Sequence, residues 1–243
     1  MEPIKHRIAH YWSHRADAFK DQRTRELKSE KRELWMDEIR PLLPDKEKLK
    51  ILDVGTGTGF FAFLMAAEGH DVIGIDITEE MIEKAELTAK ELDIPAEFYV
   101  MDAEEPDFPD ESFDVILSRN LTWALPHMDH AYRAWYRLLA PGGVIINFDA
   151  DYCNRAEECA DLDEILPPNH AHKQIGEDLL RENDAITMEL AAYQMPRPQW
   201  DVQLLIQAGF ERINVDTSVY KRVYAQIDEF YNPAPVFTIA AYK

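Results

Sequence analysis

Hydrophobic and polar positions follow two different periods along the first half of the chain. An apolar run from Leu49 to Val54 has the length and continuity of a buried strand, and three glycines follow it directly. From Phe60 onward the apolar positions recur every three to four residues, which predicts a helix. A second apolar run, from 71 to 75, ends at Asp76. Strand, glycine turn, helix and strand form the opening unit of an α/β fold that binds nucleotides.

The rest of the chain continues this alternation of short apolar runs and helical spacing. Further strands are predicted at 97–101, 112–118, 144–148, 211–219 and 236–242, and helices at 4–20, 24–39, 78–92, 128–139, 175–193 and 197–208. Strands that alternate with helices favour a parallel sheet covered on both faces. The alternation lapses from 150 to 197, a polar segment after the fifth strand. We interpret this segment as a lid at the ligand edge of the sheet.

Three glycines at alternate positions, Gly55, Gly57 and Gly59, form the turn between the first strand and the helix. Glycine allows a sharp turn and lets a ligand approach the backbone beside the free N–H groups of a helix N-terminus. The dinucleotide fingerprint G-x-G-x-x-G requires a glycine at the next position, where this chain has Phe60. Asp53 lies beside the turn, where it would repel a phosphate and attract an ammonium group. A nucleotide-dependent oxidoreductase is therefore the weaker alternative.

Four sequence patterns together resemble one enzyme family. They are hydrophobic-Asp-hydrophobic-Gly-x-Gly-x-Gly at 52–59, Phe-Asp-Val-Ile at 113–116, Leu-x-Pro-Gly-Gly at 139–143 and Tyr-Trp-x-x-Arg-Ala at 11–16. The chain resembles the class I S-adenosylmethionine-dependent methyltransferases, in particular the small-molecule type of ubiquinone and menaquinone biosynthesis. The resemblance implies a three-layer α/β sandwich around a seven-stranded, mostly parallel sheet with an antiparallel last strand.

The resemblance also divides the chain into the parts of a single methyltransferase domain. We expect an N-terminal helical cap at 1–45, a cofactor-binding core at 46–149, a lid insertion after the fifth strand at 150–197, and a C-terminal helix with a strand hairpin at 198–243. Two helices before the first strand are additional to a minimal nucleotide fold. In this family such helices cap the cofactor.

By the same resemblance the cofactor is S-adenosyl-L-methionine, held by segments that meet at one edge of the sheet. The implied residues are Tyr11, Arg15, Asp53, Gly55, Gly57, Gly59, Asp76, Ile77, Met81, Asp102, Ala103, Ser118, Arg119 and Asn120. Asp53 and the glycines would hold the methionyl part, Asp76 the ribose hydroxyls, and Asp102 with its neighbour the adenine. Asp76 follows the first glycine by about 20 residues, as expected of a ribose ligand. An equally good interpretation is that Tyr11 only packs within a helix and that Arg15 is solvated.

Methyl transfer from a sulfonium requires alignment of donor and acceptor more than it requires a general base. The sequence nevertheless offers candidate bases near the expected sheet edge, of which we select His127, Asp149 and Tyr152. Three further histidines, His130, His170 and His172, share that region. A histidine considered alone is more commonly a surface or packing residue than a catalytic one.

The predicted lid contains side chains of the types that bind metals. Cys153 and Cys159 lie near His170 and His172, but the two cysteines are too far apart for the usual zinc spacing of two to four residues. We therefore predict no metal. A thiol, metalloid or metal-bearing substrate at these residues is a more speculative alternative. Two cysteines provide no disulfide framework, which is typical of the cytoplasm.

Composition restricts the class of substrate. The formal net charge is −20, so the surface repels nucleic acid phosphates and anionic membranes. No apolar segment approaches the ~20 residues that span a bilayer, and no signal sequence follows the N-terminus. A small molecule is the favoured methyl acceptor, and the oligomeric state is left open. Methylation of protein or RNA is less favoured, and a non-catalytic cofactor-binding protein or partner subunit is the alternative outside enzymes.

Overall fold

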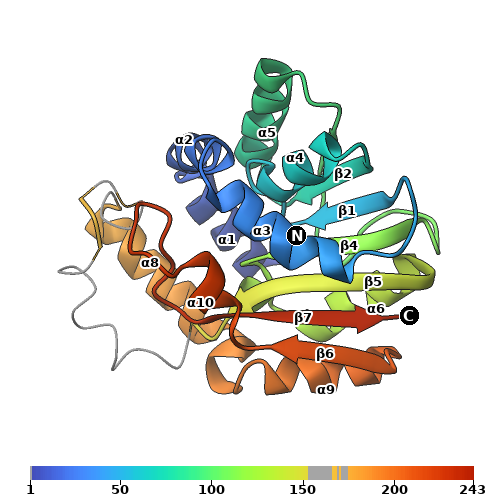
Figure 1. The fold of residues 1–243 in the computed structure, drawn as a ribbon. Coiled ribbons are helices and arrows are strands. Elements are labelled where there is room, and N and C mark those ends of the chain that lie inside the picture. The colour runs from blue at the N-terminus through green and yellow to red at the C-terminus, as the bar shows by residue number, and fades with distance from the viewer. Residues whose placement is uncertain (1, 153–165, 169, 171–174) are drawn as a thin grey trace.

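The computed structural model describes residues 2–152, 166–168, 170 and 175–243. Its strands are β1 Lys50–Val54, β2 Asp71–Asp76, β3 Glu97–Val100, β4 Phe113–Arg119, β5 Leu139–Ala150, β6 Arg212–Asp216 and β7 Val236–Tyr242. They form one seven-stranded sheet in the order β3-β2-β1-β4-β5-β7-β6 (Figure 1). β1 to β5 pair in parallel, whereas β7 runs antiparallel to both β5 and β6. The predicted fold class is confirmed.

Helices cover both faces of this sheet and bury two separate cores. The helices are α1 Pro3–Ser13, α2 Ala16–Leu27, α3 Lys31–Ile39, α4 Phe60–Ala67, α5 Glu79–Leu92, α6 Met128–Leu138, α8 Glu177–Glu189, α9 Gln199–Ala208 and α10 Val219–Val223, with short 3-10 turns η1 Arg40–Leu42, η2 Thr122–Ala124 and η4 Ala191–Gln194. On one face, α3, α4, α5 and α10 pack around the fully buried Trp35, whose ring meets Phe61 and Phe148 edge-on. On the other, α6 and α9 pack around Trp135.

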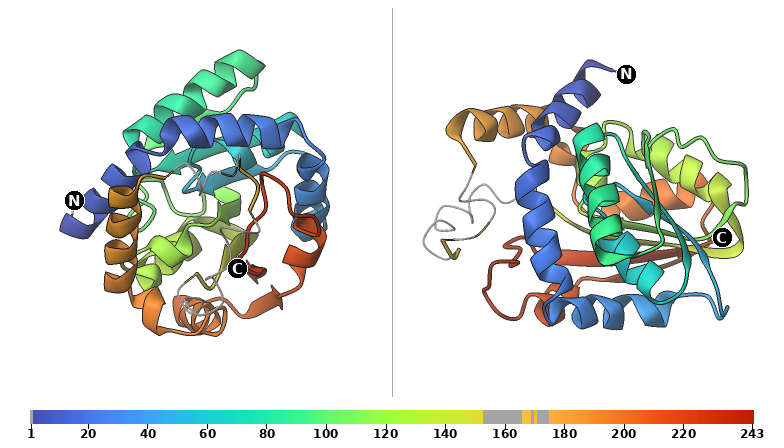
Figure 2. Two further views of the ribbon diagram at one scale, coloured as in Figure 1. Left: turned by 90° about the vertical axis from the view of Figure 1, so that its left-hand side faces the viewer. Right: turned by 90° about the horizontal axis from the view of Figure 1, so that it is seen from above.

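Three helices lie at the end of the sheet where the parallel strands finish. Figure 1 shows α1, α2 and α8 at the end where β7 begins, and Figure 2 looks onto that end. Ile8 and Tyr11 of α1 pack against Ile186 and Leu190 from the α8 region. Arg7 bonds Glu182 at 2.7 Å and Glu189 at 2.6 Å. The N-terminal helix and the helix after the fifth strand therefore form one packed unit.

The predicted helices at 4–20 and 24–39 were wrong in their boundaries, because the chain forms three shorter helices there. α1 ends at Ser13 and α2 ends at Leu27. A serine hydroxyl lies at each break: Ser13 donates to the carbonyl of His10, and Ser29 donates to that of Glu26, each at 2.8 Å. Serine side chains compete in this way for the carbonyls that would continue a helix.

Further differences from prediction lie in the second half of the chain. The strand predicted at 144–148 is longer, since β5 runs from Leu139 to Ala150. The strand predicted at 211–219 ends at Asp216, and Val219 instead begins α10, where it is fully buried against the sheet. Asp216 accepts bonds from the backbone and hydroxyl of Ser218, which turns the chain out of the strand. The predicted helix at 175–193 ends at Glu189 and continues as a separate 3-10 turn.

Candidate active site

A cavity of about 620 Å³ opens at the carboxyl ends of the parallel strands. Loops after β1, β2, β3 and β4 line one side, and α1 and α2 cover it. Of the residues that the sequence proposed for the cofactor, the cavity wall contains Tyr11, Arg15, Asp53, Gly55, Gly57, Asp76, Ile77, Met81, Asp102, Ala103, Arg119 and Asn120. The structure therefore brings these segments, widely separated in sequence, to one place. Gly59 and Ser118 lie outside the wall, and Ser118 is fully buried.

The glycine turn has backbone angles that other residues rarely adopt. Gly55, Gly57 and Gly59 have φ values of +65°, +55° and +92°. A Cβ atom on Gly55 or Gly59 would meet the Leu121 or Phe63 side chain at 2.7 Å or 2.6 Å, whereas on Gly57 it would meet nothing within 4 Å. Gly57 thus presents bare backbone to the cavity, as a ligand that contacts the main chain requires.

Asp53 stabilises this turn by hydrogen bonds to the turn and to the start of α4. Its Oδ2 accepts hydrogen bonds from the Thr56 hydroxyl at 2.6 Å and from the Ala62 backbone N–H at 3.0 Å. The side chain borders the cavity but is 2% exposed, so its visible partners are the turn and α4. Burial, assisted by the nearby charge of Asp76, raises the pKa of Asp53 to about 7.

The raised pKa of Asp53 makes stability depend on pH. A carboxyl that binds its proton near pH 7 when folded, but near pH 4 when unfolded, stabilises the fold at low pH and loses that contribution as pH rises through 7. Relative to Asp53→Asn, the wild type is therefore expected to gain about 1–3 kcal/mol of unfolding free energy between pH 8 and pH 5. Urea denaturation of both proteins across this range measures the difference. A flat difference, or one that grows with pH, would contradict this assignment.

The acidic residues after β2 and β3, Asp76 and Asp102, already accept hydrogen bonds from backbone N–H groups. Asp76 accepts from Gly57 N–H at 3.0 Å and from Thr78 N–H at 2.9 Å, and burial raises the pKa of Asp76. Asp102 accepts from Glu104 N–H at 2.9 Å and from the Lys5 ammonium at 2.8 Å. Sequence patterns gave no indication of Lys5, which reaches the cavity from α1 and also pairs with Glu104.

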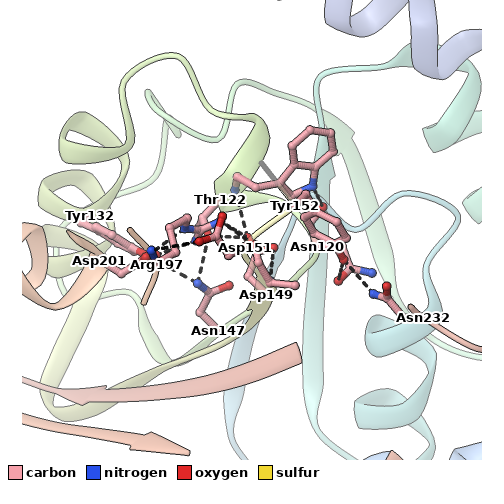
Figure 3. A network of polar contacts seen from close by, with 12 residues as sticks. Asn120, Thr122, Tyr132, Asn147, Asp149, Asp151, Tyr152, Arg197, Asp201 and Asn232 are labelled. Carbon is pink, nitrogen blue, oxygen red and sulfur yellow. Dashed lines mark hydrogen bonds and ion pairs between the residues drawn. The ribbon is translucent and has the colours of Figure 1, made fainter. Parts of the chain in front are cut away.

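Of the three candidate bases, only Tyr152 lines the cavity. Its hydroxyl donates to Asn120 Oδ1 at 2.9 Å and accepts from Asn232 Nδ2 at 2.8 Å (Figure 3). Burial raises the pKa of Tyr152, so the phenol stays protonated at neutral pH. His127 lies outside the cavity wall; its side chain is 42% exposed, and its Nε2 lies 3.2 Å from Glu2. Neither arrangement favours a general base.

The third candidate, Asp149, belongs to a buried network behind the cavity wall. Its Oδ2 accepts from the Thr122 hydroxyl at 2.5 Å and from Trp123 N–H at 2.9 Å, and lies 3.3 Å from the Arg197 guanidinium. Arg197 also pairs with Asp201 at 2.6 Å, and all three charged side chains are fully buried (Figure 3). Asp149 therefore anchors the loop after β4, and it is not among the residues that line the cavity. This arrangement does not favour a general base, and the predicted role of Asp149 stays a prediction.

The residues that suggested a metal are only partly described. His170 is buried, and its Nε2 lies 2.8 Å from the carbonyl of Tyr231. Cys153, Cys159 and His172 lie outside the described residues. Within 2–152, 166–168, 170 and 175–243, no group of three or more metal-binding side chains comes together. In the same part of the chain, no helix is both long and apolar enough to cross a membrane.

Comparison with known proteins shows the family. A family profile described as a methyltransferase domain matches residues 45–197, which is more than half of the chain. The chain belongs to the methyltransferase-domain family. The match covers the glycine turn, all the strands that line the cavity and the segment that we predicted as a lid.

Curated relatives of this methyltransferase domain share part of its length. Phosphoethanolamine N-methyltransferase 3 of Arabidopsis thaliana is 38% identical over 113 residues, which are 46% of this chain and 23% of that protein. The ubiquinone biosynthesis O-methyltransferase of Pseudomonas putida strain GB-1 is 34% identical over 140 residues, 57% of each protein. The matched region thus spans about a quarter of the plant enzyme and just over half of the bacterial one.

A solved structure shows the same fold. The phosphoethanolamine N-methyltransferase 2 of Haemonchus contortus, determined in complex with S-adenosyl-L-methionine, superposes with a TM-score of 0.62 at 20% identity. The superposition covers 86% of this chain and 51% of that one.

Proposed function

We propose that this chain is an S-adenosyl-L-methionine-dependent methyltransferase that acts on a small molecule. The proposal rests on the cavity wall, where Asp53, Asp76 and Asp102 line the same cavity as the bare backbone of Gly57, and Asp76 accepts a hydrogen bond from Gly57 N–H. Such a site suits a ligand with a cationic centre, an ammonium group and a ribose. It suits a pyrophosphate less well, because Asp76 and the neighbouring acidic side chains would repel its negative charge. Membership of the methyltransferase-domain family supports the same cofactor.

The protein's contribution to methyl transfer would be positioning. When bound, the cofactor supplies a methyl group that its sulfonium has already activated. Holding donor and acceptor in line can contribute roughly 7–11 kcal/mol. α1 and α2 contribute to the cavity wall and would help to exclude water from it. Tyr152, kept protonated by burial, would donate a hydrogen bond to the acceptor or hold Asn120 in place, and we assign no general base among the described residues that line the cavity.

The proposal extends to the domain organisation and setting. Residues 1–45 would cap the cofactor, 46–149 would bind it, 150–197 would close over the acceptor, and 198–243 would complete the sheet. The net charge of −20 supports a small-molecule substrate over nucleic acid or an anionic membrane, and two cysteines in the chain support the cytoplasm. The phosphoethanolamine and ubiquinone-pathway relatives support a small acceptor, although neither fixes the accepting atom.

Asp76→Ala is expected to weaken cofactor binding by about 1–3 kcal/mol, the scale of hydrogen bonds lost from a charged group. Asp76 would bind the ribose hydroxyls while it continues to hold Gly57 N–H. Calorimetric titration with S-adenosylhomocysteine measures the change. Asp71→Ala is the matched control, because Asp71 lies at the opposite end of the same strand and pairs with Lys48 on the surface. Equal affinities in all three proteins would remove Asp76 from the site.

Methyl transfer itself is tested with cofactor labelled in its methyl group. Purified protein is incubated with the labelled cofactor and a panel of small phenols, amines, thiols and carboxylates. Formation of S-adenosylhomocysteine together with a labelled product is the expected result. Cofactor binding without turnover of any acceptor would favour the alternative of a non-catalytic binding protein or partner subunit.

A further inference from the structure

The cavity wall contains charges of both signs. The acidic residues Asp53, Asp76 and Asp102 belong to the part to which the cofactor was assigned above. Arg23 from α2 and Arg119 from β4 also line the wall, and the positive charge of Arg119 is near enough to Asp53 to oppose the rise in the pKa of that carboxyl. Both arginines pair with one carboxylate, Glu26, which is fully buried; Arg119 Nη2 lies 2.9 Å from its Oε1. Burial alone would raise the pKa of Glu26, but the two guanidinium groups lower it. The three side chains therefore carry one net positive charge.

Arg119 has more donors than the protein uses. Its Nη2 donates to Glu26 and, at 3.1 Å, to the Tyr224 hydroxyl. Its Nε and Nη1 are buried and have no hydrogen-bond partner among the described residues. The side chain is only 8% exposed, and its guanidinium lies 4.4 Å from the ring centre of Trp35 and 4.9 Å from that of Phe60. A buried charged group with unused donors is costly unless a ligand completes its bonding.

The wall around these arginines is aromatic. Phe60 and Tyr224 lie beside Arg119, and the cavity is completed there by Phe19, Phe230 and Tyr231. Low-dielectric surroundings strengthen the attraction between the excess positive charge and an anion. The cofactor brings one carboxylate of its own, and we assign it here to Arg15, which also donates to the Tyr11 hydroxyl at 2.9 Å. The net positive charge of Arg23, Arg119 and Glu26 is then available to bind an anionic group of the acceptor.

We propose that the methyl acceptor carries an oxyanion, a carboxylate or a phosphate, on an apolar body, and that Arg119 and Arg23 bind this group. The inference rests on the proposed function, because it assigns the aromatic wall around Arg23 and Arg119 to the acceptor. It adds the substrate class, and it assigns the Arg119 side chain to the acceptor, whereas the family resemblance placed Arg119 among the cofactor-binding residues. A neutral acceptor of the same shape would leave the cluster with its charge uncompensated.

The test uses protein saturated with S-adenosylhomocysteine, so that no turnover occurs. It is titrated with benzoate, phenyl phosphate and the neutral benzamide by calorimetry. At least one anion is expected to bind 10-fold or more tightly than benzamide, and the tighter of the two identifies the oxyanion. Arg119→Met and Arg23→Met are expected to abolish the preference, and Arg119→Lys to retain part of it. Arg133→Met is the control, since Arg133 pairs with Asp129 on the surface of α6.

Three results would overturn the inference. They are benzamide binding as tightly as both anions, no anion binding to the saturated wild type, and Arg119→Met weakening S-adenosylhomocysteine as much as it weakens the anions. The last would assign these arginines to the cofactor's carboxylate. Failure of S-adenosylhomocysteine to bind the wild type is a separate outcome, seen before any anion is added, and it would reject the proposed function itself.

Discussion

Replacing Arg197 with methionine is expected to lower the free energy of unfolding by about 3–5 kcal/mol, the scale measured when one partner of a buried ion pair is removed. Arg197 compensates two fully buried carboxylates, Asp149 and Asp201, and also donates to the Thr122 hydroxyl at 2.6 Å. Without it, both carboxylates must be protonated or hydrated at neutral pH. The substitution should also disturb the cavity wall, because Asp149 accepts a hydrogen bond from the backbone N–H of Trp123, and Trp123 lines the cavity.

Urea denaturation of Arg197→Met against Arg181→Met measures this effect with a matched control. Arg181 pairs with Glu177 and Asp178 on α8, but its side chain is 75% exposed, and such surface pairs contribute little. The Arg181 variant is expected to unfold at the wild-type urea concentration. Equal midpoints for the two variants would show that the buried network does not stabilise the fold.

Gly57→Ala is expected to lower the affinity for S-adenosylmethionine by 100-fold or more, roughly 3 kcal/mol. The added methyl group would clash with no protein atom, since nothing lies within 4 Å of its position. It would occupy space in the cavity where the cofactor's methionyl part is assigned to contact backbone. The positive φ of +55° adds about 1–2 kcal/mol of strain in the folded protein, which lowers stability without abolishing folding.

Gly69→Ala separates backbone strain from lost binding. Gly69 follows α4 with a φ of +92°, an added Cβ meets nothing within 4 Å, and the residue lies outside the cavity wall. Both variants should therefore lose similar stability, as measured by thermal unfolding. Only the Gly57 variant should lose cofactor binding in calorimetry. A Gly57→Ala protein that binds with wild-type affinity would place the cofactor elsewhere.

The sheet and the glycine turn could be predicted because their signals are local. The run from Leu49 to Val54 is apolar at four of its six positions, because a central parallel strand is buried on both faces. The glycines at 55, 57 and 59 are needed for backbone angles that the structure shows to be left-handed. The same local apolar runs predicted that Asp76 and Asp102 lie at strand ends. Parallel pairing of the strands brings those ends together.

The residues that sequence reasoning missed act through long-range contacts. Lys5 bonds Asp102 across 97 positions, and Arg197 bonds Thr122 across 75; neither has a local pattern. The contacts of Asp149 could not be predicted, because an acidic residue at a strand end has the same sequence pattern whether it faces a ligand or a buried arginine. The Arg23–Glu26–Arg119 cluster joins α2 to β4 and likewise appears only in the folded chain.

Calorimetric titration of the purified wild-type protein with S-adenosylmethionine, and separately with NADH, tests the central claim most directly. Micromolar binding of S-adenosylmethionine and no binding of NADH are expected, because the cavity combines acidic side chains with a turn that lacks the third dinucleotide glycine. Binding of NADH alone, or of neither compound, would contradict that claim.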